Sequence, residues 1–263
     1  MNVIKPRRGA MRLMLQTGLL AIAEPALAQP PAHAAALPGA ADEAPKFHAD
    51  GTPAHWPGNT IICHIDRRSD TFMAMLDLHT VLMRSGLTHR VVPLPPASYH
   101  TTVFEGISYP QRARRFPRDL PRDASEAACD AAFLKKLQQF DLGCRLPLRM
   151  RPSKLELQTN PYNIQLEPVD AAENHKIRGL RDRLAALLQF RDDEHDSYRF
   201  HTTLNYFSSP LNDAEQQQFA RLRQRMLTSF IARSPLIELQ APEFCYFDDM
   251  FEFRPQLRLH NKS

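Results

Sequence analysis

Two histidines, His100 and His201, each stand two residues before a threonine, in the repeated pattern aromatic–His–Thr–Thr–aliphatic. The two copies, residues 98–104 and 199–205, lie in separate halves of the chain. An imidazole can both accept and donate a proton near neutral pH, because its ordinary pKa is about 6.5. A hydroxyl can donate a hydrogen bond to a phosphoryl oxygen. Two such pairs around one small anion predict acid–base chemistry at a phosphate ester.

Both copies are predicted strands, because Tyr, Phe, Thr, Val and Leu predominate in them. Side chains of a strand alternate between its two faces. His100 therefore shares a face with Thr102, and His201 shares a face with Thr203. We expect the two threonine hydroxyls to bind the non-bridging oxygens of a substrate while the two imidazoles move protons.

The same alternation places further residues near the histidines. Phe104 shares the predicted face of His100, where it could stack on a base. Arg199 and Asn205 share the predicted face of His201, whereas Tyr206 points away from it. We expect Phe104 and Arg199 to bind substrate; packing or solvent contact is the alternative for each.

The duplicated motif, residues 100–103 (HTTV) and 201–204 (HTTL), resembles that of the two-histidine phosphoesterases, the LigT-like or cyclic-phosphodiesterase-like superfamily. The resemblance covers roughly residues 58–256. It implies an α+β fold of two pseudo-symmetric lobes, with antiparallel sheets facing across a central cleft and helices outside. It also implies that His100 and His201 act as general acid and base, without a metal or other cofactor, and leaves open which is which.

The reaction implied by this resemblance is hydrolysis of a cyclic phosphodiester, in a 2′,3′-cyclic nucleotide or at an RNA end. An exported protein of the same fold that binds a nucleotide or phosphorylated ligand with little turnover is the alternative. Such a binder could use Arg or Lys instead of the histidine pair. A metal-dependent phosphohydrolase is disfavoured, because the sequence has no HExxH or Asp-rich metal motif. No protein partner is implied, and we expect a monomer.

Hydrophobic periodicity predicts the elements that position the motifs. A buried strand over 60–65 ends near His64, which is expected to be structural. The other predicted strands cover residues 90–94, 98–106, 163–168, 199–208 and 237–239, with the last strands within 244–253, where Asp248–Asp249 forms a turn. The predicted helices run from Ser69 or Asp70 to Gly86, over 173–190, and from Asn212 or Asp213 to about 231. Two α+β halves thus each contribute one motif.

Residues 107–154 interrupt this order and are predicted to be an insertion, with a helix over 124–140 closed by Gly143. Five arginines precede that helix (Arg112, Arg114, Arg115, Arg118 and Arg122). Their guanidinium groups could form a rim that holds phosphate. The alternative is a solvated surface segment whose arginines are neutralised by nearby acidic residues.

The N-terminal residues 1–28 are predicted to be a secretory signal peptide, with a basic start, a short apolar run and an Ala–Leu–Ala cleavage site. We therefore expect a periplasmic or secreted protein, exported by the Sec or twin-arginine route, with no membrane span. A disordered cytosolic extension is the alternative. Residues 29–57 are a predicted linker with an ordered lead-in from about Phe47 to Trp56, and residues 257–263 are a predicted tail.

Charge and cysteine content limit the interpretation further. The signal peptide carries most of the formal net charge of +4, so the basic pI does not indicate a nucleic-acid-binding surface. The four cysteines permit two disulfides in an oxidising compartment, such as Cys129–Cys144 and Cys63–Cys245. Four buried free thiols are the alternative.

Overall fold

The computed structural model describes residues 1, 45–153, 162–191 and 193–262. Apart from Met1, the predicted signal peptide lies outside these residues, as does most of the predicted linker. The chain divides into two units, Met1–Ala35 and Ala36–Ser263, and all described helices and strands belong to the second unit.

The described residues form a mixed α+β fold, which confirms the predicted fold class. The strands are β1 (Gly58–His64), β2 (Val91–Pro93), β3 (His100–Ser108), β4 (Leu148–Pro152), β5 (Tyr162–Pro168), β6 (His201–Phe207), β7 (Ile237–Leu239), β8 (Glu243–Phe247) and β9 (Arg254–Arg258). The helices are α1 (Asp70–Met83), α2 (Glu126–Gln138), α3 (Ala171–Leu188) and α4 (Asp213–Arg233).

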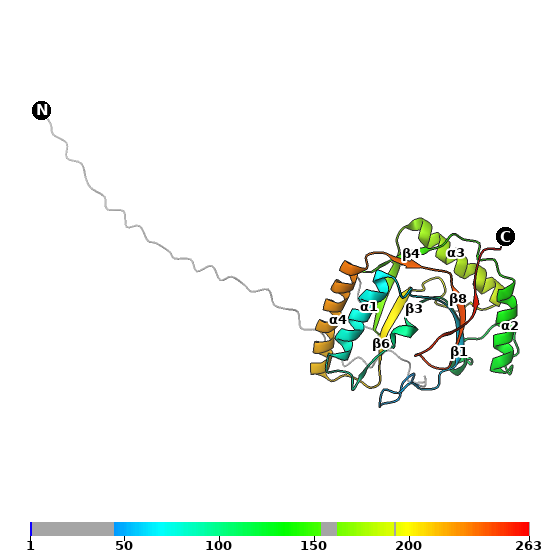
Figure 1. The fold of residues 1–263 in the computed structure, drawn as a ribbon, viewed down its shortest axis with the longest axis horizontal. Helices are drawn as coiled ribbons and strands as arrows, with labels where there is room; N and C mark the ends of the chain where they lie inside the picture. The colour runs from blue at the N-terminus through cyan, green and yellow to red at the C-terminus, as the bar shows by residue number, and fades with distance from the viewer. Residues whose placement is uncertain (2–44, 154–161, 192, 263) are drawn as a thin grey trace. The chain divides into compact units, whose positions relative to one another are not determined.

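The strands pair in the order β7-β4-β5-β6-β3-β1-β8-β9, with β2 added to β6, and the pairings are antiparallel. We call β1, β3, β8 and β9 the first lobe, and β4 to β7 the second lobe. The lobes meet where Thr101 of β3 pairs with Thr202 of β6. The two sheets are therefore continuous through the two motif strands, and the joined sheet curls (Figure 1).

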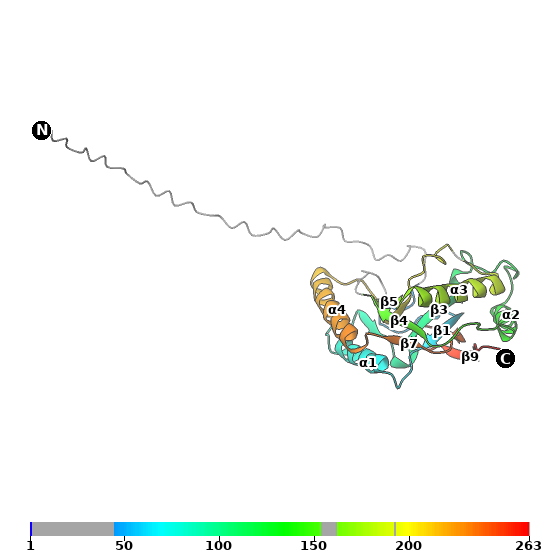
Figure 2. The ribbon, with the colours of Figure 1, turned by 90° about the horizontal axis from the view of Figure 1, so that it is seen from above.

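The helices pack against strands of both lobes. Helix α1 contacts α4, β2 and β6, whereas α3 contacts β3, β4 and β5, and α2 contacts α3 and β9 (Figure 2). Each motif strand is therefore backed by a helix from the other half of the chain. Side-chain caps define the starts of α1 and α4 at the predicted residues Ser69 and Asn212. Helix α3 ends before the predicted residue 190, because Gln189 adopts the left-handed conformation (φ 52°).

Strand β4 was not predicted. It lies at the end of segment 107–154, and it pairs with β5 and β7. Its side chains alternate, with Leu148 and Met150 buried and Arg149 and Arg151 exposed, which is the period of a half-buried strand. Arginines on the exposed face and a terminal proline obscured that signal.

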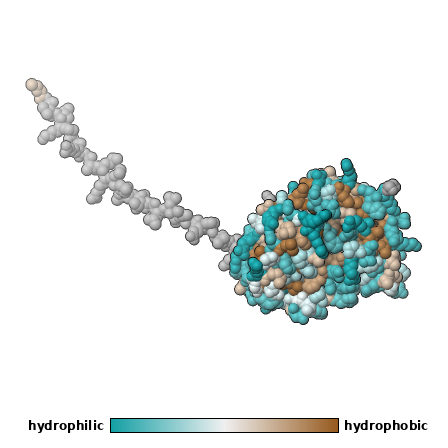
Figure 3. Space-filling view, in the orientation of Figure 1, coloured by the Kyte–Doolittle hydropathy of each residue, from teal (hydrophilic) through white to brown (hydrophobic). Residues whose placement is uncertain are grey.

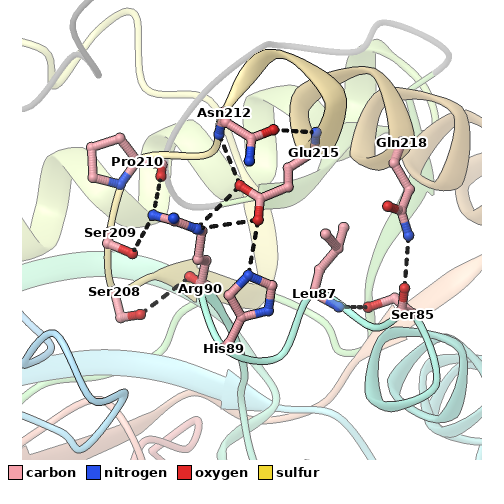
Figure 4. Close-up of polar contacts among 10 residues, drawn as sticks. All are labelled: Ser85, Leu87, His89, Arg90, Ser208, Ser209, Pro210, Asn212, Glu215 and Gln218. Carbon is pink, nitrogen blue, oxygen red and sulfur yellow. Dashed lines mark hydrogen bonds and ion pairs between the residues drawn. The ribbon is translucent and has the colours of Figure 1, made fainter.

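A cluster of polar contacts attaches the loop before β2 to the end of β6 and the start of α4 (Figure 4). The Arg90 guanidinium donates to the Pro210 carbonyl at 2.8 Å and pairs with Glu215 at 3.1 Å. Glu215 also completes the capping box of α4 with Asn212. The Ser208 amide donates to the Arg90 carbonyl at 2.9 Å. These contacts fix β2 beside β6, next to the second motif.

Other features of the described residues concern the surface and the cysteines. Hydrophilic and hydrophobic residues are interspersed on the face seen in Figure 3. No helix within the described ranges is long and apolar enough to cross a bilayer.

The four cysteines, Cys63, Cys129, Cys144 and Cys245, are free thiols, and all except Cys144 are buried. Neither disulfide considered from the sequence is formed.

Candidate active site

One cavity of about 170 Å³ contains the four residues that the sequence singled out, His100, Thr102, His201 and Thr203. Its walls also carry charged groups and aromatic rings: Lys46, Glu105 and Arg115, and Trp56, Tyr198, Tyr206, Phe247 and Phe253. The cavity is smaller than the pockets of about 300–1,000 Å³ that enclose whole drug-sized ligands. It therefore suits a phosphate group with part of its substituent better than a whole oligonucleotide.

The pairing of β3 with β6 sets the relation between the two motifs. Thr101 lies opposite Thr202, and residue numbers run in opposite directions on the two antiparallel strands. His100 therefore lies beside Thr203, and Thr102 lies beside His201. Each histidine has the threonine of the other motif as its cross-strand neighbour, related by a local two-fold axis.

Main-chain carbonyl groups hold both imidazole rings in the same way. The Nδ1 atom of His100 donates to the Ser98 carbonyl at 2.7 Å, and that of His201 donates to the Arg199 carbonyl at 2.9 Å. A carbonyl only accepts, so Nδ1 carries the proton in each neutral ring and Nε2 carries the lone pair. Neither Nε2 atom has a hydrogen-bond partner within the described ranges. Both rings can thus accept a proton at Nε2, and a protonated ring can donate one there.

Burial favours the neutral form of His100. It lowers the pKa of His100 to about 4, and the neighbouring imidazoles of His64 and His201 act in the same direction. The hydrogen bond to Ser98 opposes this effect. Phe253 covers the ring, with ring centroids 4.3 Å apart. His100 is therefore a neutral group in the free protein at neutral pH.

The pKa of His201 is also lowered, but the charges that act on it differ from those near His100. Burial is the main cause of its lowered pKa, and the Lys46 ammonium adds to the effect. The hydrogen bond to Arg199 and the carboxylate of Glu105 oppose it. The charges around His201 therefore come from outside its own strand.

His64, the third histidine near the motifs, pairs with His100 across β1 and β3 but does not line the cavity. Its Nδ1 atom lies 2.7 Å from Glu243, which also binds Arg258. These contacts agree with the structural role expected from the sequence.

Both motif strands contain a β-bulge at the residue after the second threonine. In β3 the register against β1 shifts between Thr102 and Phe104, so Val103 is the extra residue. In β6 the register against β5 shifts between Thr203 and Asn205, so Leu204 is the extra residue. A bulge reverses the face on which the following side chains lie. The burial patterns of the first six residues of β3 and β6 are accordingly identical.

The bulges correct three predictions made from simple alternation, those for Phe104, Asn205 and Tyr206. Phe104 and Asn205 do not share the face of the histidines; both are buried on the opposite side of the sheet. Glu105 and Tyr206 turn into the cavity instead. The phenyl ring of Phe104 packs against Phe190, at 6.3 Å between centroids. Phe104 is therefore a core residue, and base stacking by it is ruled out by its place in the fold.

The carbonyl group of the extra residue in each bulge has its own donor. The Val103 carbonyl accepts from the buried guanidinium of Arg181 at 2.7 Å. The Leu204 carbonyl accepts from the main-chain amide of Leu94, after β2, at 2.9 Å. Burying either carbonyl without a donor would cost about 1–3 kcal/mol, so these contacts stabilise the bulges.

The remaining predicted site residues differ in their environment. The Thr203 hydroxyl donates to the Asn163 side chain at 2.8 Å, whereas the Thr102 hydroxyl has no hydrogen-bond partner among the described residues. Arg199 is exposed and its side chain does not line the cavity. It contributes its carbonyl group, which orients His201.

The arginines of segment 107–154 do not form a common rim. Arg112 and Arg122 bind main-chain carbonyls of their own loop and lie over the Phe116 ring. Arg115 lines the cavity and pairs with Glu105 at 2.6 Å. Arg112 and Arg122 therefore stabilise the loop. Of the five arginines that precede α2, Arg115 is the one that lines the cavity.

The segment before β1, residues 45–57, contributes to the cavity wall. The alternation of side chains along the two motif strands could not predict this contribution. Lys46 and Trp56 both line the cavity. The segment folds back through a bridge between Phe47 and Pro53, and the Trp56 amide donates to the Asp248 carbonyl at 2.7 Å. The aromatic residues Phe47 and Trp56, near the end of a polar, proline-containing segment, had indicated that this part of the segment is ordered.

One cluster among the described residues has a donor set that could hold a metal ion: Asp182, His195 and Asp196, with ligand atoms within 4.8 Å of one another. Arg191 pairs with both aspartates. None of these residues lines the cavity. The cluster is thus separate from the histidine pair.

Comparison with known proteins supports the assignment suggested by the motifs. Residues 46–160 match the family model described as 2H-phosphodiest, domain of unknown function (DUF1868). The fold is similar to the crystal structure of a conserved protein of unknown function from Agrobacterium tumefaciens strain C58, with a TM-score of 0.73 and 26% sequence identity. That similarity covers 81% of this chain and 90% of the other. No curated protein matches the sequence significantly.

Proposed function

We propose that this chain, whose residues 46–160 match the 2H-phosphodiest family model, hydrolyses a cyclic phosphodiester with His100 and His201 as general acid and base. That match supports a phosphodiesterase-type function. The proposed substrate is a 2′,3′-cyclic nucleotide or the cyclic phosphate at an RNA end. Thr102 and Thr203 would bind the phosphoryl oxygens.

The matched orientation of the two imidazoles carries this proposal. Each ring is fixed through Nδ1 by the carbonyl two residues earlier and lines the same cavity with Nε2 unbound by any described group. His64, which has a structural role, instead pairs its Nδ1 atom with the Glu243 carboxylate and does not line the cavity. Two rings prepared identically around one small space are suited to proton transfer on both sides of a phosphorus atom.

The reaction follows from these positions. Nε2 of one histidine takes a proton from water as the water oxygen forms a bond to phosphorus. The bond from phosphorus to the 2′ or 3′ oxygen breaks, and that oxygen takes a proton from Nε2 of the other histidine. The threonine hydroxyls donate hydrogen bonds to the non-bridging oxygens, where negative charge increases in the transition state. The product is a phosphomonoester, and the next turnover requires the two histidines to exchange protonation states.

The lowered pKa values are compatible with one histidine acting as an acid. A bound phosphodiester carries a negative charge, and a negative charge close to an imidazole raises its pKa. Substrate binding therefore promotes protonation of one of the two rings. The other ring, lowered by burial, stays neutral and accepts the proton from water.

The direct test is hydrolysis of 2′,3′-cyclic nucleotides by the wild type, His100→Ala and His201→Ala in the presence of EDTA. We expect the wild type to turn over and each variant to lose about two to four orders of magnitude in kcat, the usual contribution of a positioned acid or base. His48→Ala, at an exposed histidine outside the cavity, is the matched control and should retain activity.

Three outcomes would contradict the proposal. Full activity of both cavity variants would exclude the histidine pair as the catalytic groups. An inactive wild type that nevertheless binds the cyclic nucleotide would favour the alternative, a binding protein with the same fold and little turnover. Loss of wild-type activity in EDTA would indicate a metal-dependent hydrolase instead.

A further inference from the structure

We propose that Lys46 is a phosphate-binding residue of the substrate site, and that it sets the substrate preference of the reaction proposed above. This inference rests on that proposed function for its catalytic readout, but it also predicts anion binding independently of turnover. Lys46 lies outside both motifs, in the lead-in that precedes the two lobes.

The position of Lys46 is fixed by its neighbours. The Ala54 amide donates to the Lys46 carbonyl at 3.0 Å, and Phe47 pairs with Pro53. The Phe47 ring is buried against Tyr206, with centroids 5.1 Å apart. The hairpin thus brings the base of the Lys46 side chain against the second motif strand. A flexible tail would not place a cation at one wall of the cavity.

The ammonium group lies between two aromatic rings of the cavity wall. It is 5.4 Å from the centroid of Trp56 and 5.5 Å from that of Tyr206. Such cation–π contacts hold an ammonium group in place but do not neutralise its charge or satisfy its N–H donors. Within the described part of the chain, the Lys46 ammonium has no carboxylate partner. It therefore offers an oriented, unneutralised cation to an anion in the cavity.

The other cationic group in the cavity wall is in a different state. Arg115 lies 2.6 Å from the Glu105 carboxylate, so its charge is largely compensated. The local charge that an incoming phosphate meets therefore comes mainly from Lys46. A hydrogen bond between an ammonium group and a phosphate is charge-assisted and about twice as strong as a neutral one.

Lys46 also influences His201 directly. Its charge lowers the pKa of His201, whereas Glu105 raises it. The other titratable groups beside the ring include His100 and Tyr198, whose ring centroid lies 6.2 Å from that of His201. Removal of the Lys46 charge should therefore raise the pKa of His201. A shift of the pH profile therefore tests whether the Lys46 charge lies beside His201, whereas kcat/KM and phosphate affinity test whether Lys46 binds substrate.

The anion that Lys46 binds is a phosphoryl group from one of two sources. It is either the reacting cyclic phosphate or a second phosphate on the same nucleotide. Two substrates distinguish these sources: 2′,3′-cyclic AMP, and the same nucleotide with a 5′-phosphate. Contact with the reacting group would affect both substrates equally, whereas contact with a second phosphate would affect only the 5′-phosphorylated one.

The test compares the wild type with Lys46→Met, which keeps an unbranched apolar chain against the two rings. We expect kcat/KM to fall about 10- to 100-fold, on one or both substrates. A rise in KM alone would indicate ground-state phosphate binding, and a fall in kcat would indicate contact with the reacting group. The limb of the pH profile that reports His201 should move to higher pH. Lys46→Arg, which retains the charge, should recover part of the loss.

The matched control is Lys135→Met, which removes the same charge from an exposed position on α2. It should leave both substrates and the pH profile unchanged. Equal kinetics and equal pH profiles for Lys46→Met and Lys135→Met would overturn the inference. Circular dichroism and thermal unfolding establish that the variants are folded.

A binding experiment separates this inference from the proposed function. Titration of adenosine 2′-monophosphate and inorganic phosphate into the full chain measures anion binding without turnover. If the wild type hydrolyses no cyclic nucleotide, weaker phosphate binding by Lys46→Met than by Lys135→Met would still support the inference. Equal phosphate affinity in those two variants, or no binding by the wild type, would reject it.

Discussion

The two lobes present the same groups to the cavity but differ directly beside them. In each lobe a histidine is held through Nδ1 by the carbonyl two residues earlier, and an aliphatic residue three positions later forms a bulge. The bulge places Glu105 in the cavity in the first lobe and Tyr206 in the second. The common features are those that acid–base chemistry requires, and the differing ones lie where substrate substituents would bind.

The lobes also differ in how the bulges are stabilised. The bulge at Val103 depends on the side chain of Arg181, whereas the bulge at Leu204 depends on the main-chain amide of Leu94. Almost any substitution removes a side-chain donor, whereas only substitution by proline removes a main-chain donor. The first lobe should therefore be the more sensitive of the two to mutation.

The largest effect that would sharpen this comparison is expected for Arg181→Met. The substitution leaves the buried Val103 and His195 carbonyls without the guanidinium donors that they have now. It also removes the contact between the guanidinium and the Tyr198 ring, at 4.0 Å from its centroid. We expect the free energy of unfolding, measured in urea, to fall by about 2–4 kcal/mol.

The control for this prediction is Arg221→Met, at an exposed position on α4. It should change stability by less than about 0.5 kcal/mol, as surface substitutions usually do. If Arg181→Met were as stable as this control, the Val103 bulge would not need its side-chain donor, and the proposed difference between the lobes would disappear.

A smaller effect is expected in the pH dependence of stability. The histidines of both lobes should make the protein less stable as the pH falls. The pKa of His100 is about 4 in the folded protein and about 6.5 when unfolded, so the unfolded chain binds the proton more tightly. Stability from this group is complete above pH 6.5 and is lost as the pH falls toward 4. The loss at pH 4.5 is about 2.5 kcal/mol.

His100→Gln should remove this part of the acid destabilisation, so that the variant loses less stability than the wild type between pH 7 and pH 4.5. His201→Gln should act in the same direction, because burial also lowers the pKa of His201. Urea unfolding at both pH values measures the difference, with His48→Gln as the exposed control. Superimposable pH dependences of the wild type and His100→Gln would show that burial does not perturb this group.

Much of the fold and the centre of the site could be predicted from local patterns. The two motifs, the helices α1, α3 and α4, and the strands β1 and β5 follow from hydrophobic periodicity and turn residues. His100, Thr102, His201 and Thr203 could be grouped because the motif is duplicated, and the cavity contains all four. These predictions succeeded because each rests on a few adjacent residues.

The rest depended on contacts between distant segments. Simple alternation fails after a bulge, so it placed Phe104, Asn205 and Tyr206 on the wrong face. It also failed to place Glu105 in the cavity. Nothing within the HTTV and HTTL motifs marks the bulges, because the carbonyls of Val103 and Leu204 are bound by residues far away in the chain, Arg181 and Leu94. The contribution of Lys46 likewise required the hairpin to fold against β6.

The smallest effect is expected at Tyr206, where the second lobe differs from the first. Among the described residues, the hydrogen-bond partner of its hydroxyl is the Met250 sulfur, at 3.6 Å, whereas its ring packs against Phe47 and lies beside the Lys46 ammonium. Tyr206→Phe keeps the ring, so kcat/KM should stay within about threefold of the wild type, and stability should change by less than about 1 kcal/mol. Tyr206→Ala removes the ring and should weaken phosphate binding as Lys46 loses one of its two supports. If Tyr206→Phe were as impaired as Tyr206→Ala, the hydroxyl would itself contact substrate, and the second lobe would contribute a polar group at this position, as the first does with Glu105.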